Sequence, residues 1–151
     1  MSAEHRMSFL GYDMYRYDQR TGNGGVALLI VKTLDHSFIG IEEEVELQCV
    51  TVEVRASTGK FKVTSVYKAP NDELLAEDID DLLRGNDKRI IIGDLNCKNP
   101  EWNSATLNTN GRKLAEFTEA QGAFVIGPIT PTFLPSGRGR PDVLDIAIVK
   151  K

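Results

Sequence analysis

Apolar residues recur at every second position along much of the chain, which is the spacing of β-strands, and at helical spacing in two segments. The apolar run over residues 26–31 predicts a strand that is buried on both faces. Over residues 45–55 the alternation slips by one position, which indicates either a bulge or a strand with both faces covered. A turn at residues 57–60 and a second alternating segment at 61–67 complete an antiparallel hairpin.

The second half of the chain mixes helices with strands. A helix is predicted to open at Pro70, with Asn71 or Asp72 as its N-cap, and to end at Gly85. A second helix is predicted over residues 111–121, with a glycine stop directly after it. Further strands are predicted over residues 89–93, 124–126 and 143–149. Hairpins beside helical crossovers predict an α/β sandwich of two mixed sheets with helices outside.

Composition limits the class of protein. The 151 residues favour one compact domain, and 41% hydrophobic with 26% charged residues exclude a disordered or fibrous chain. The formal net charge of −4 excludes a histone-like protein that holds nucleic acid by bulk charge, although a local basic patch stays open. Residues 1–6 lack the apolar segment of a signal peptide, and no apolar run is long enough to cross a membrane.

The cysteines and histidines do not form a recognisable metal or disulfide pattern. Cys49 and Cys97 lie far apart without CxxC spacing, which predicts buried, reduced thiols in an intracellular protein. His5 and His36 have no second ligand at the spacing of a metal site.

The sharpest local pattern is Gly-Asp-Leu-Asn at residues 93–96, directly after the predicted buried strand 89–92. A carboxylate at Asp94 and a carboxamide at Asn96 are expected to point the same way from the strand end. Such a pair can hold a metal ion or a water molecule against a phosphate. The alternative is a plain turn, because glycine, aspartate and asparagine are turn formers.

Three further segments carry residues suited to a phosphate or metal site. Tyr67 and Asn71 flank a strand end, where the phenol could donate to a phosphate oxygen; a half-buried strand tyrosine is the alternative. Asp145 interrupts an apolar strand, where it would ligate a metal, orient a histidine or pair with Arg140. Arg138 and Arg140 lie on a glycine-containing loop, which suits either phosphate contact or simple solvation.

Taken in order, these segments resemble the endonuclease/exonuclease/phosphatase superfamily. More narrowly, they resemble the apurinic-like endonuclease domain of jockey-type non-LTR retrotransposons. Each segment alone is a weak match, whereas the ordered set is a strong one, and it covers nearly the whole chain. The segments that carry the resemblance are residues 24–27, 65–71, 93–96, 102–104, 110–112, 127–128, 131–132 and 140–146.

The resemblance implies a four-layer α/β/β/α sandwich, here incomplete, and Mg²⁺-dependent cleavage of a DNA phosphodiester. Residues 1–9 would be a polar N-terminal segment, and residues 10–151 would be a partial domain of this superfamily. In such retrotransposons the nick primes reverse transcription by a separate domain of the same polyprotein. The implied partner is therefore DNA, with no membrane, and the implied location is the nucleus.

The resemblance also implies a role for each matched residue. Tyr67 would support the phosphate, and Asp94 would align and deprotonate the attacking water. Asn96 would help to place the water or the metal, so that Asp94 and Asn96 are the candidate metal ligands. Asp145 matches an aspartate that orients a catalytic histidine. The candidate DNA-contacting residues are Asn71, Thr132, Arg138 and Arg140.

The chain departs from the family pattern at both ends. The family begins with strands that bear an asparagine and the principal glutamate metal ligand, and it ends with a Ser-Asp-His strand; none of these is matched here. Because each lost transition-state contact costs about a hundredfold in rate, the isolated chain is expected to be inactive or weakly active. Missing terminal strands are also expected to expose sheet edges and favour self-association.

Two other functions stay open. One is a non-catalytic, domesticated remnant that binds nucleic acid or protein through the same surface. The other is a phosphatase of the same superfamily, although residues 102–104 and 140–142 favour the retroelement branch.

Overall fold

The computed structural model describes residues 9–18, 25–43 and 47–150. The expectations that concern residues 1–8, residue 24 and Val45 lie outside these ranges. The strands are β1 (Tyr12–Asp18), β2 (Gly25–Val31), β3 (Asp35–Glu43), β4 (Leu47–Ala56), β5 (Gly59–Lys68), β6 (Lys88–Asp94), β7 (Phe124–Ile126) and β8 (Asp145–Lys150). The helices are α1 (Ala76–Leu83), α2 (Thr109–Ala120) and a short 3-10 helix, η1 (Pro100–Trp102). The sequence had not predicted β1 or β3.

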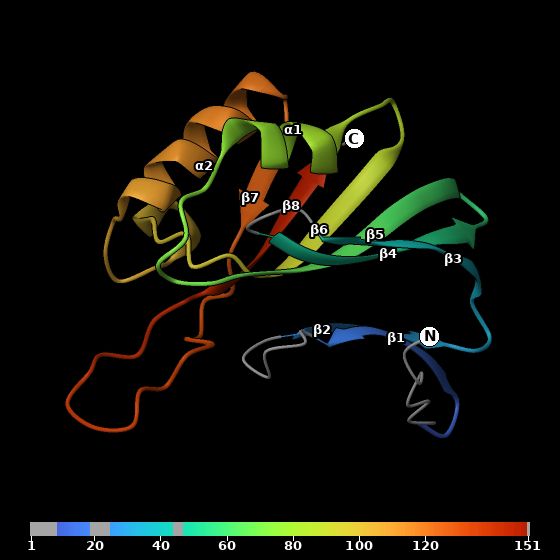
Figure 1. The fold of residues 1–151 in the computed structure, drawn as a ribbon, viewed down its shortest axis with the longest axis horizontal. Coiled ribbons are helices and arrows are strands. Elements are labelled where there is room, and N and C mark those ends of the chain that lie inside the picture. The colour runs from blue at the N-terminus through green and yellow to red at the C-terminus, as the bar shows by residue number, and fades with distance from the viewer. Residues whose placement is uncertain (1–8, 19–24, 44–46, 151) are drawn as a thin grey trace.

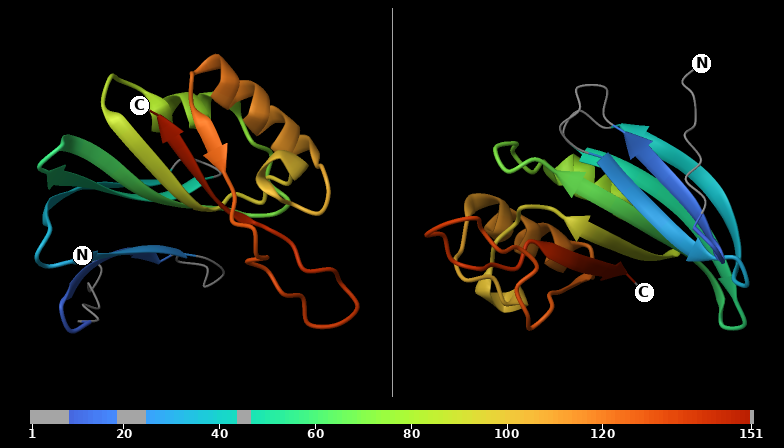
Figure 2. Two further views of the ribbon diagram at one scale, coloured as in Figure 1. Left: turned by 180° about the vertical axis from the view of Figure 1, so that it is seen from behind. Right: turned by 90° about the horizontal axis from the view of Figure 1, so that it is seen from below.

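The strands form two sheets that face each other (Figure 1). β1 and β2 make a two-stranded antiparallel sheet, and the other strands make a six-stranded sheet in the order β3-β4-β5-β6-β8-β7. The larger sheet is mixed, because β5 and β6 are parallel while its other pairs are antiparallel. α1 and α2 cover the face of the larger sheet that is turned away from β1 and β2 (Figure 2). The predicted α/β sandwich of two sheets with outer helices is confirmed.

The central hairpin β4–β5 is covered on both faces. Leu47 and Cys49 belong to the core beneath the helices, whereas Val50, Val52 and Val54 pack against β2. The slipped alternation of this strand is therefore explained by two covered faces. The register does shift in the pairing of β4 with its neighbour β3, between Phe38 and Gly40.

Two strands are less buried than their sequences predict. In β2, Val26, Leu28 and Ile30 are buried, but Leu29 is 43% and Val31 40% exposed. The prediction of two buried faces was wrong, because no described layer covers the outer face of the small sheet. In β6, Ile92 is 45% exposed, because the small sheet does not extend over this strand of the larger sheet.

This uncovered part of the larger sheet continues across β8 and β7. Cross-strand neighbours on the exposed face form two apolar rows. The rows are Ile90–Val149–Phe124 and Ile92–Ala147–Ile126. Phe124 and Ile126 are 60% and 56% exposed. The strand β8 itself begins at Asp145, two residues later than predicted.

The helix α1 begins at Ala76 with Leu75 as N-cap, so that the predicted caps Asn71 and Asp72 were wrong. The reason lies in α2. The Asn110 carboxamide accepts a hydrogen bond from Leu74 N at 3.0 Å and donates one to Asp72 O at 2.9 Å. These bonds hold the preceding segment out of the helix, because a side chain that binds the backbone competes with helical hydrogen bonding.

The helix α2 begins two residues earlier than predicted. The Asn108 side chain caps it by accepting a hydrogen bond from Gly111 N at 2.7 Å. Gly122 follows the helix with a φ of +63°, which confirms the predicted glycine stop.

No helix in the described ranges is long and apolar enough to cross a membrane. Cys49 and Cys97 are both buried and form no disulfide with each other.

Candidate active site

Three of the predicted site residues form a row across neighbouring strands of the larger sheet. Tyr67 in β5 lies opposite Asp94 in β6, and Asp94 lies opposite Asp145 in β8. Residues that are directly opposite in a sheet project from the same face. Tyr67 packs on the cluster between the two sheets, so this row faces the side that carries β1 and β2. The tyrosine is half-buried, as its alternative interpretation proposed, and it lies beside the carboxylates as well.

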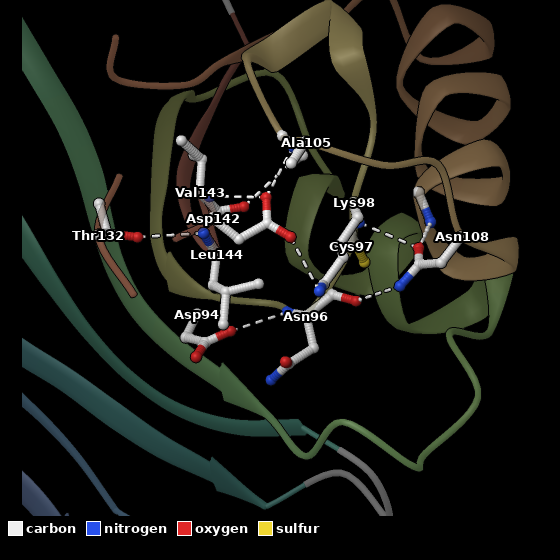
Figure 3. Close-up of polar contacts among 12 residues, drawn as sticks. Asp94, Asn96, Cys97, Lys98, Ala105, Asn108, Thr132, Asp142, Val143 and Leu144 are labelled. Carbon is white, nitrogen blue, oxygen red and sulfur yellow. Dashed lines mark hydrogen bonds and ion pairs between the residues drawn. The ribbon is translucent and has the colours of Figure 1, made fainter. Parts of the chain in front are cut away.

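Asp94 ends β6 in a tight turn. Its Oδ1 accepts a hydrogen bond from Asn96 N at 2.9 Å (Figure 3), and Asn96 has a φ of +48°. The Asn96 Nδ2 donates to Lys68 O at 2.8 Å, while Leu95 between them is fully buried. The turn interpretation of residues 93–96 is therefore correct, and the same turn presents the Asp94 carboxylate to the row.

The pKa of Asp94 is raised above the usual range of an aspartate. Burial is the main cause, and the neighbouring Asp145 carboxylate adds to it. The hydrogen bond from Asn96 N and the positive charges of Lys68 and Lys98 oppose the rise without cancelling it. A carboxylate with a raised pKa is a stronger base, which suits proton abstraction from water.

Asp145 is exposed and stands at the first position of β8. Its sequence interpretation as a carboxylate inside a buried strand was wrong, because β8 starts at this residue instead of before it. No ion pair joins it to Arg140 within the described ranges. Its position is set by Thr132, whose Oγ1 accepts hydrogen bonds from Leu144 N at 3.0 Å and Asp145 N at 3.1 Å.

The buried carboxylate of this segment is Asp142, to which the sequence had assigned no role. It is 6% exposed and forms an ion pair with Lys98 at 2.9 Å. Its Oδ1 accepts hydrogen bonds from Ala105 N at 2.8 Å and Val143 N at 2.9 Å (Figure 3). Burial alone would raise the pKa of Asp142, but Lys98 and the two backbone donors together lower it.

Asp142 also closes the base of a long projecting arm, residues 134–141, seen at the lower edge of Figure 1. Asp142 N donates to Phe133 O and Phe133 N donates to Asp142 O, each at 3.0 Å. Arg138 and Arg140 are exposed on this arm. The base of the arm is thus tied through Asp142 to Lys98, four residues after Asp94.

The remaining candidate, Asn71, is exposed on the turn that follows β5. It borders a shallow depression between this turn and the start of α2. The depression is lined by Pro70, Asn71, Asp72, Glu73, Asn108, Thr109 and Asn110. The structure therefore brings together Tyr67, Asp94 and Asp145, places Asn96 and Thr132 behind them as hydrogen-bonding partners, and leaves Asn71 on a separate turn.

The row and the Asn96 turn behind it offer oxygen atoms as possible metal ligands. Asp94 and Asp145 contribute carboxylates from adjacent strands, and Asn96 contributes a carboxamide whose Oδ1 makes no hydrogen bond within the described ranges. Oxygen donors of this kind suit Mg²⁺, which commonly binds through one or two carboxylates together with substrate phosphates. Among the described residues, no group of three or more His, Cys, Asp or Glu side chains gathers as a metal site.

Comparison with known proteins identifies the family of this chain. Residues 61–151 match the profile of the family described as "Endonuclease-reverse transcriptase", which is more than half of the chain. The chain belongs to this family. The matched region begins within β5 and contains Tyr67, Asp94 and Asp145. The resemblance to retrotransposon endonucleases that the sequence indicated is confirmed.

Two individual proteins extend the comparison. The RNA-directed DNA polymerase from mobile element jockey of Drosophila melanogaster is 29% identical over 137 residues, which is 88% of this chain. The chain spans 15% of the length of that relative. The solved endonuclease domain of TRAS1, a telomere-specific non-LTR retrotransposon, superposes with a TM-score of 0.75 at 20% identity. That match covers 95% of this chain and 68% of the TRAS1 domain, so the two endonuclease-family chains share a fold.

Proposed function

We propose that this chain is the DNA endonuclease part of a non-LTR retrotransposon polyprotein, and that it nicks one DNA strand so that a separate domain can prime reverse transcription. The observation that carries the proposal is the row of Tyr67, Asp94 and Asp145 across β5, β6 and β8. Family membership supports the endonuclease class. The substrate, the metal and the nuclear location that priming on genomic DNA requires are parts of the proposal.

In the proposed reaction a water molecule attacks the phosphorus of a phosphodiester that lies along the row. Asp94 aligns this water and takes its proton as the new P–O bond forms. Priming needs a free 3′ hydroxyl, so the bond that breaks joins phosphorus to the 3′ oxygen, and that oxygen takes a proton from solvent. The Tyr67 phenol donates a hydrogen bond to a phosphate oxygen and thereby stabilises the charge that develops there.

Mg²⁺, held by Asp94 with Asn96 or Asp145, would supply positive charge to the phosphate in the transition state. The fit rests on the oxygen donors of these side chains and on the like charge of Asp94 and Asp145, which lie on adjacent strands. His36 lies elsewhere, with its Nε2 3.6 Å from Asp13 in β1, so it is not the histidine that Asp145 would orient. We therefore expect slow nicking, because each missing transition-state contact costs about a hundredfold or more.

The direct test is prolonged incubation of the chain with supercoiled plasmid in Mg²⁺, with EDTA as the control. Slow, EDTA-sensitive conversion to nicked circles is the expected result. DNA binding without any nicking would instead favour the non-catalytic remnant. Hydrolysis of a small phosphomonoester without nicking would favour the phosphatase.

The arm is proposed to bind DNA through its two arginines. A chain of net charge −4 needs a local positive surface to hold DNA, and Arg138 and Arg140 are both exposed. Replacing both with alanine is expected to weaken DNA binding and to reduce the slope of log K against log salt by about 1.8, or about 0.9 for each lost phosphate contact. Fluorescence anisotropy over a salt series measures both quantities.

The matched control for the arm is the double variant Lys60→Ala/Arg84→Ala, which removes the same charge from exposed positions outside it. If this control reduces the slope as much as the arm variant does, the arm is not the binding surface.

Thr132 and Asn71 are proposed as further DNA contacts. Self-association is also proposed, supported by the exposed apolar rows on β6, β8 and β7, and sedimentation velocity measures it.

A further inference from the structure

The turn after β6 is held in place by Asn108, the residue that precedes α2. The Asn108 Nδ2 donates a hydrogen bond to Asn96 O at 2.9 Å, and the Asn108 Oδ1 accepts one from Lys98 N at 3.0 Å (Figure 3). The backbone joins the same contact, because Asn108 N donates to Lys98 O at 3.0 Å. One residue therefore binds the chain at positions 96 and 98, directly beyond Asp94.

The orientation of the Asn108 carboxamide is fixed by its partners. Both groups that face Oδ1, Lys98 N and Gly111 N, are hydrogen-bond donors, so this atom must be the oxygen. The amide nitrogen is thereby turned toward Asn96 O, which is an acceptor. Gly111 also lies so close that a Cβ added to it would be 1.9 Å from Lys98 O. The first turn of α2 consequently packs directly against the backbone after Asp94.

Asn96 needs such support, because its backbone lies in the left-handed region, with a φ of +48°. A residue other than glycine keeps this conformation only where the surrounding structure enforces it. Three of its polar groups are bound: N by Asp94 Oδ1, Nδ2 by Lys68 O, and O by the Asn108 Nδ2. The remaining polar atom is the Asn96 Oδ1, which the proposed mechanism gives to the water or the metal ion. Asn108 thus helps to hold the turn while this oxygen stays available.

The helix that carries Asn108 at its start is itself firmly placed. Two residues further on, the Asn110 carboxamide binds Leu74 N and Asp72 O in the segment after β5. Leu114, on the next turn of α2, is fully buried in the core beneath the helices. The helix is therefore a fixed support, and Asn108 is the residue that ties the turn after β6 to it.

We propose that Asn108 is a positioning residue of the nicking site. Its carboxamide fixes the left-handed turn at Asn96 against α2, so that the Asp94 carboxylate and the Asn96 Oδ1 meet the phosphodiester in one geometry. This inference rests on the proposed endonuclease function. It goes beyond that function by assigning a role to a residue that acts on the site only through the backbone of residues 96 and 98.

The test replaces Asn108 with aspartate, which has the same shape but lacks the amide donor. Aspartate caps a helix as well as asparagine does, and its oxygens can still accept from Gly111 N and Lys98 N. Only the bond to Asn96 O is lost. The expected result is a kcat for nicking lower by about 10²-fold with KM within about twofold, because misplacement by about 1 Å is enough for such a loss. The melting temperature should stay within about 4 °C of the wild type, a change that corresponds to one hydrogen bond.

Two further variants separate the lost bond from the added charge. Asn108→Ser is neutral and keeps a helix cap, but its side chain is too short to reach Asn96 O, so it should lower kcat as Asn108→Asp does. Thr106→Asp adds the same negative charge at an exposed position two residues earlier and should leave kcat unchanged. If Thr106→Asp lowers kcat as much as Asn108→Asp does, the charge is the cause and the role of Asn108 is overturned.

A second measurement keeps the inference testable if the wild-type chain does not nick. Hydrogen exchange should show that the Asn96 amide, which donates to Asp94 Oδ1, loses protection in both Asn108 variants and keeps it in Thr106→Asp. Unchanged protection, or unchanged kcat in an active chain, would overturn the role of Asn108. So would a melting temperature of Asn108→Asp lowered by much more than about 4 °C, since it would mark a structural residue. Absence of nicking with loss of protection would reject the endonuclease proposal and leave Asn108 as the residue that holds this turn.

Discussion

Replacing Asp94 with asparagine is expected to abolish nicking and at the same time to stabilise the protein at neutral pH. Asparagine keeps the size of the side chain and an oxygen that can accept the hydrogen bond from Asn96 N. It removes the base that takes the proton from water, and losses of about 10²–10⁴-fold are typical for such a group. The turn itself should stay intact, so the loss of rate would report chemistry and not folding.

The gain in stability follows from the direction of the pKa shift. Burial, reinforced by Asp145, raises the pKa of Asp94 in the folded protein above its value of about 3.9 in an unfolded chain. The stability that this group contributes is therefore fully present below the unfolded pKa and is lost as pH rises through the folded pKa. At neutral pH the ionised carboxylate weakens the fold, and Asp94→Asn removes that penalty.

Asp142→Asn is the matched comparison, because it makes the same substitution at a carboxylate whose pKa is shifted the other way. Lys98 and the two backbone donors outweigh the opposing effect of burial and lower the pKa of Asp142. Its contribution to stability is present above the unfolded pKa and is lost as pH falls through the folded pKa. Asp142→Asn should therefore lower the free energy of unfolding at neutral pH, by about 2 kcal/mol for a charge-assisted bond.

Urea denaturation of the wild type and both variants at several pH values measures these opposite signs. The difference between wild type and Asp94→Asn should disappear below about pH 4, where the wild-type carboxyl is protonated in both states. A destabilised Asp94→Asn at pH 7 would contradict the electrostatic account of the row. Nicking that survives in this variant would remove Asp94 from the proposed mechanism.

Replacing Gly93 with alanine is expected to cause a large loss of stability, because the added methyl group would collide with the backbone of the neighbouring strand. A Cβ at this position would lie 1.9 Å from Val66 O and 2.9 Å from Val66 C on the neighbouring parallel strand. The backbone of β5 cannot move away without breaking the pairing that sets Tyr67 opposite Asp94. In addition, Gly93 has a φ of +152°, which side chains rarely allow.

Overpacking of this kind costs up to about 3 kcal/mol, and backbone strain adds about 1 kcal/mol or more. Gly122→Ala is the control, because Gly122 also has a positive φ, +63°, but a Cβ added there would meet nothing within 4 Å. It should cost only the backbone strain, about 1 kcal/mol. Equal losses of unfolding free energy in the two variants would show that the close approach of β5 and β6 does not constrain the site.

The sequence determined the local elements of this protein. The hairpin of β4 and β5, the strand before Asp94 and the glycine stop of α2 were all predicted, because each depends on alternation or on turn residues next to one another. The ordered motifs also indicated the family, although the chain has no single diagnostic motif.

The tertiary structure decided which of the candidate residues meet. Tyr67, Asp94 and Asp145 are separated by 27 and 51 positions, and only the register of β5, β6 and β8 places them in one row. A pattern of neighbouring residues does not contain the register between distant strands. It likewise does not show that the Lys68 ammonium would be buried against the turn after β5, where it donates to Ala69 O and Asp72 O.

The wrong predictions have the same origin. α1 starts late because Asn110, on another helix, binds the segment before it. Asp142 is buried and Asp145 exposed because Lys98 and Ala105 pack against the former, while β8 begins at the latter. Local propensity and periodicity are properties of adjacent residues and can be read from the sequence. Burial, register and charge pairing depend on partners far along the chain, and only the folded structure fixes them.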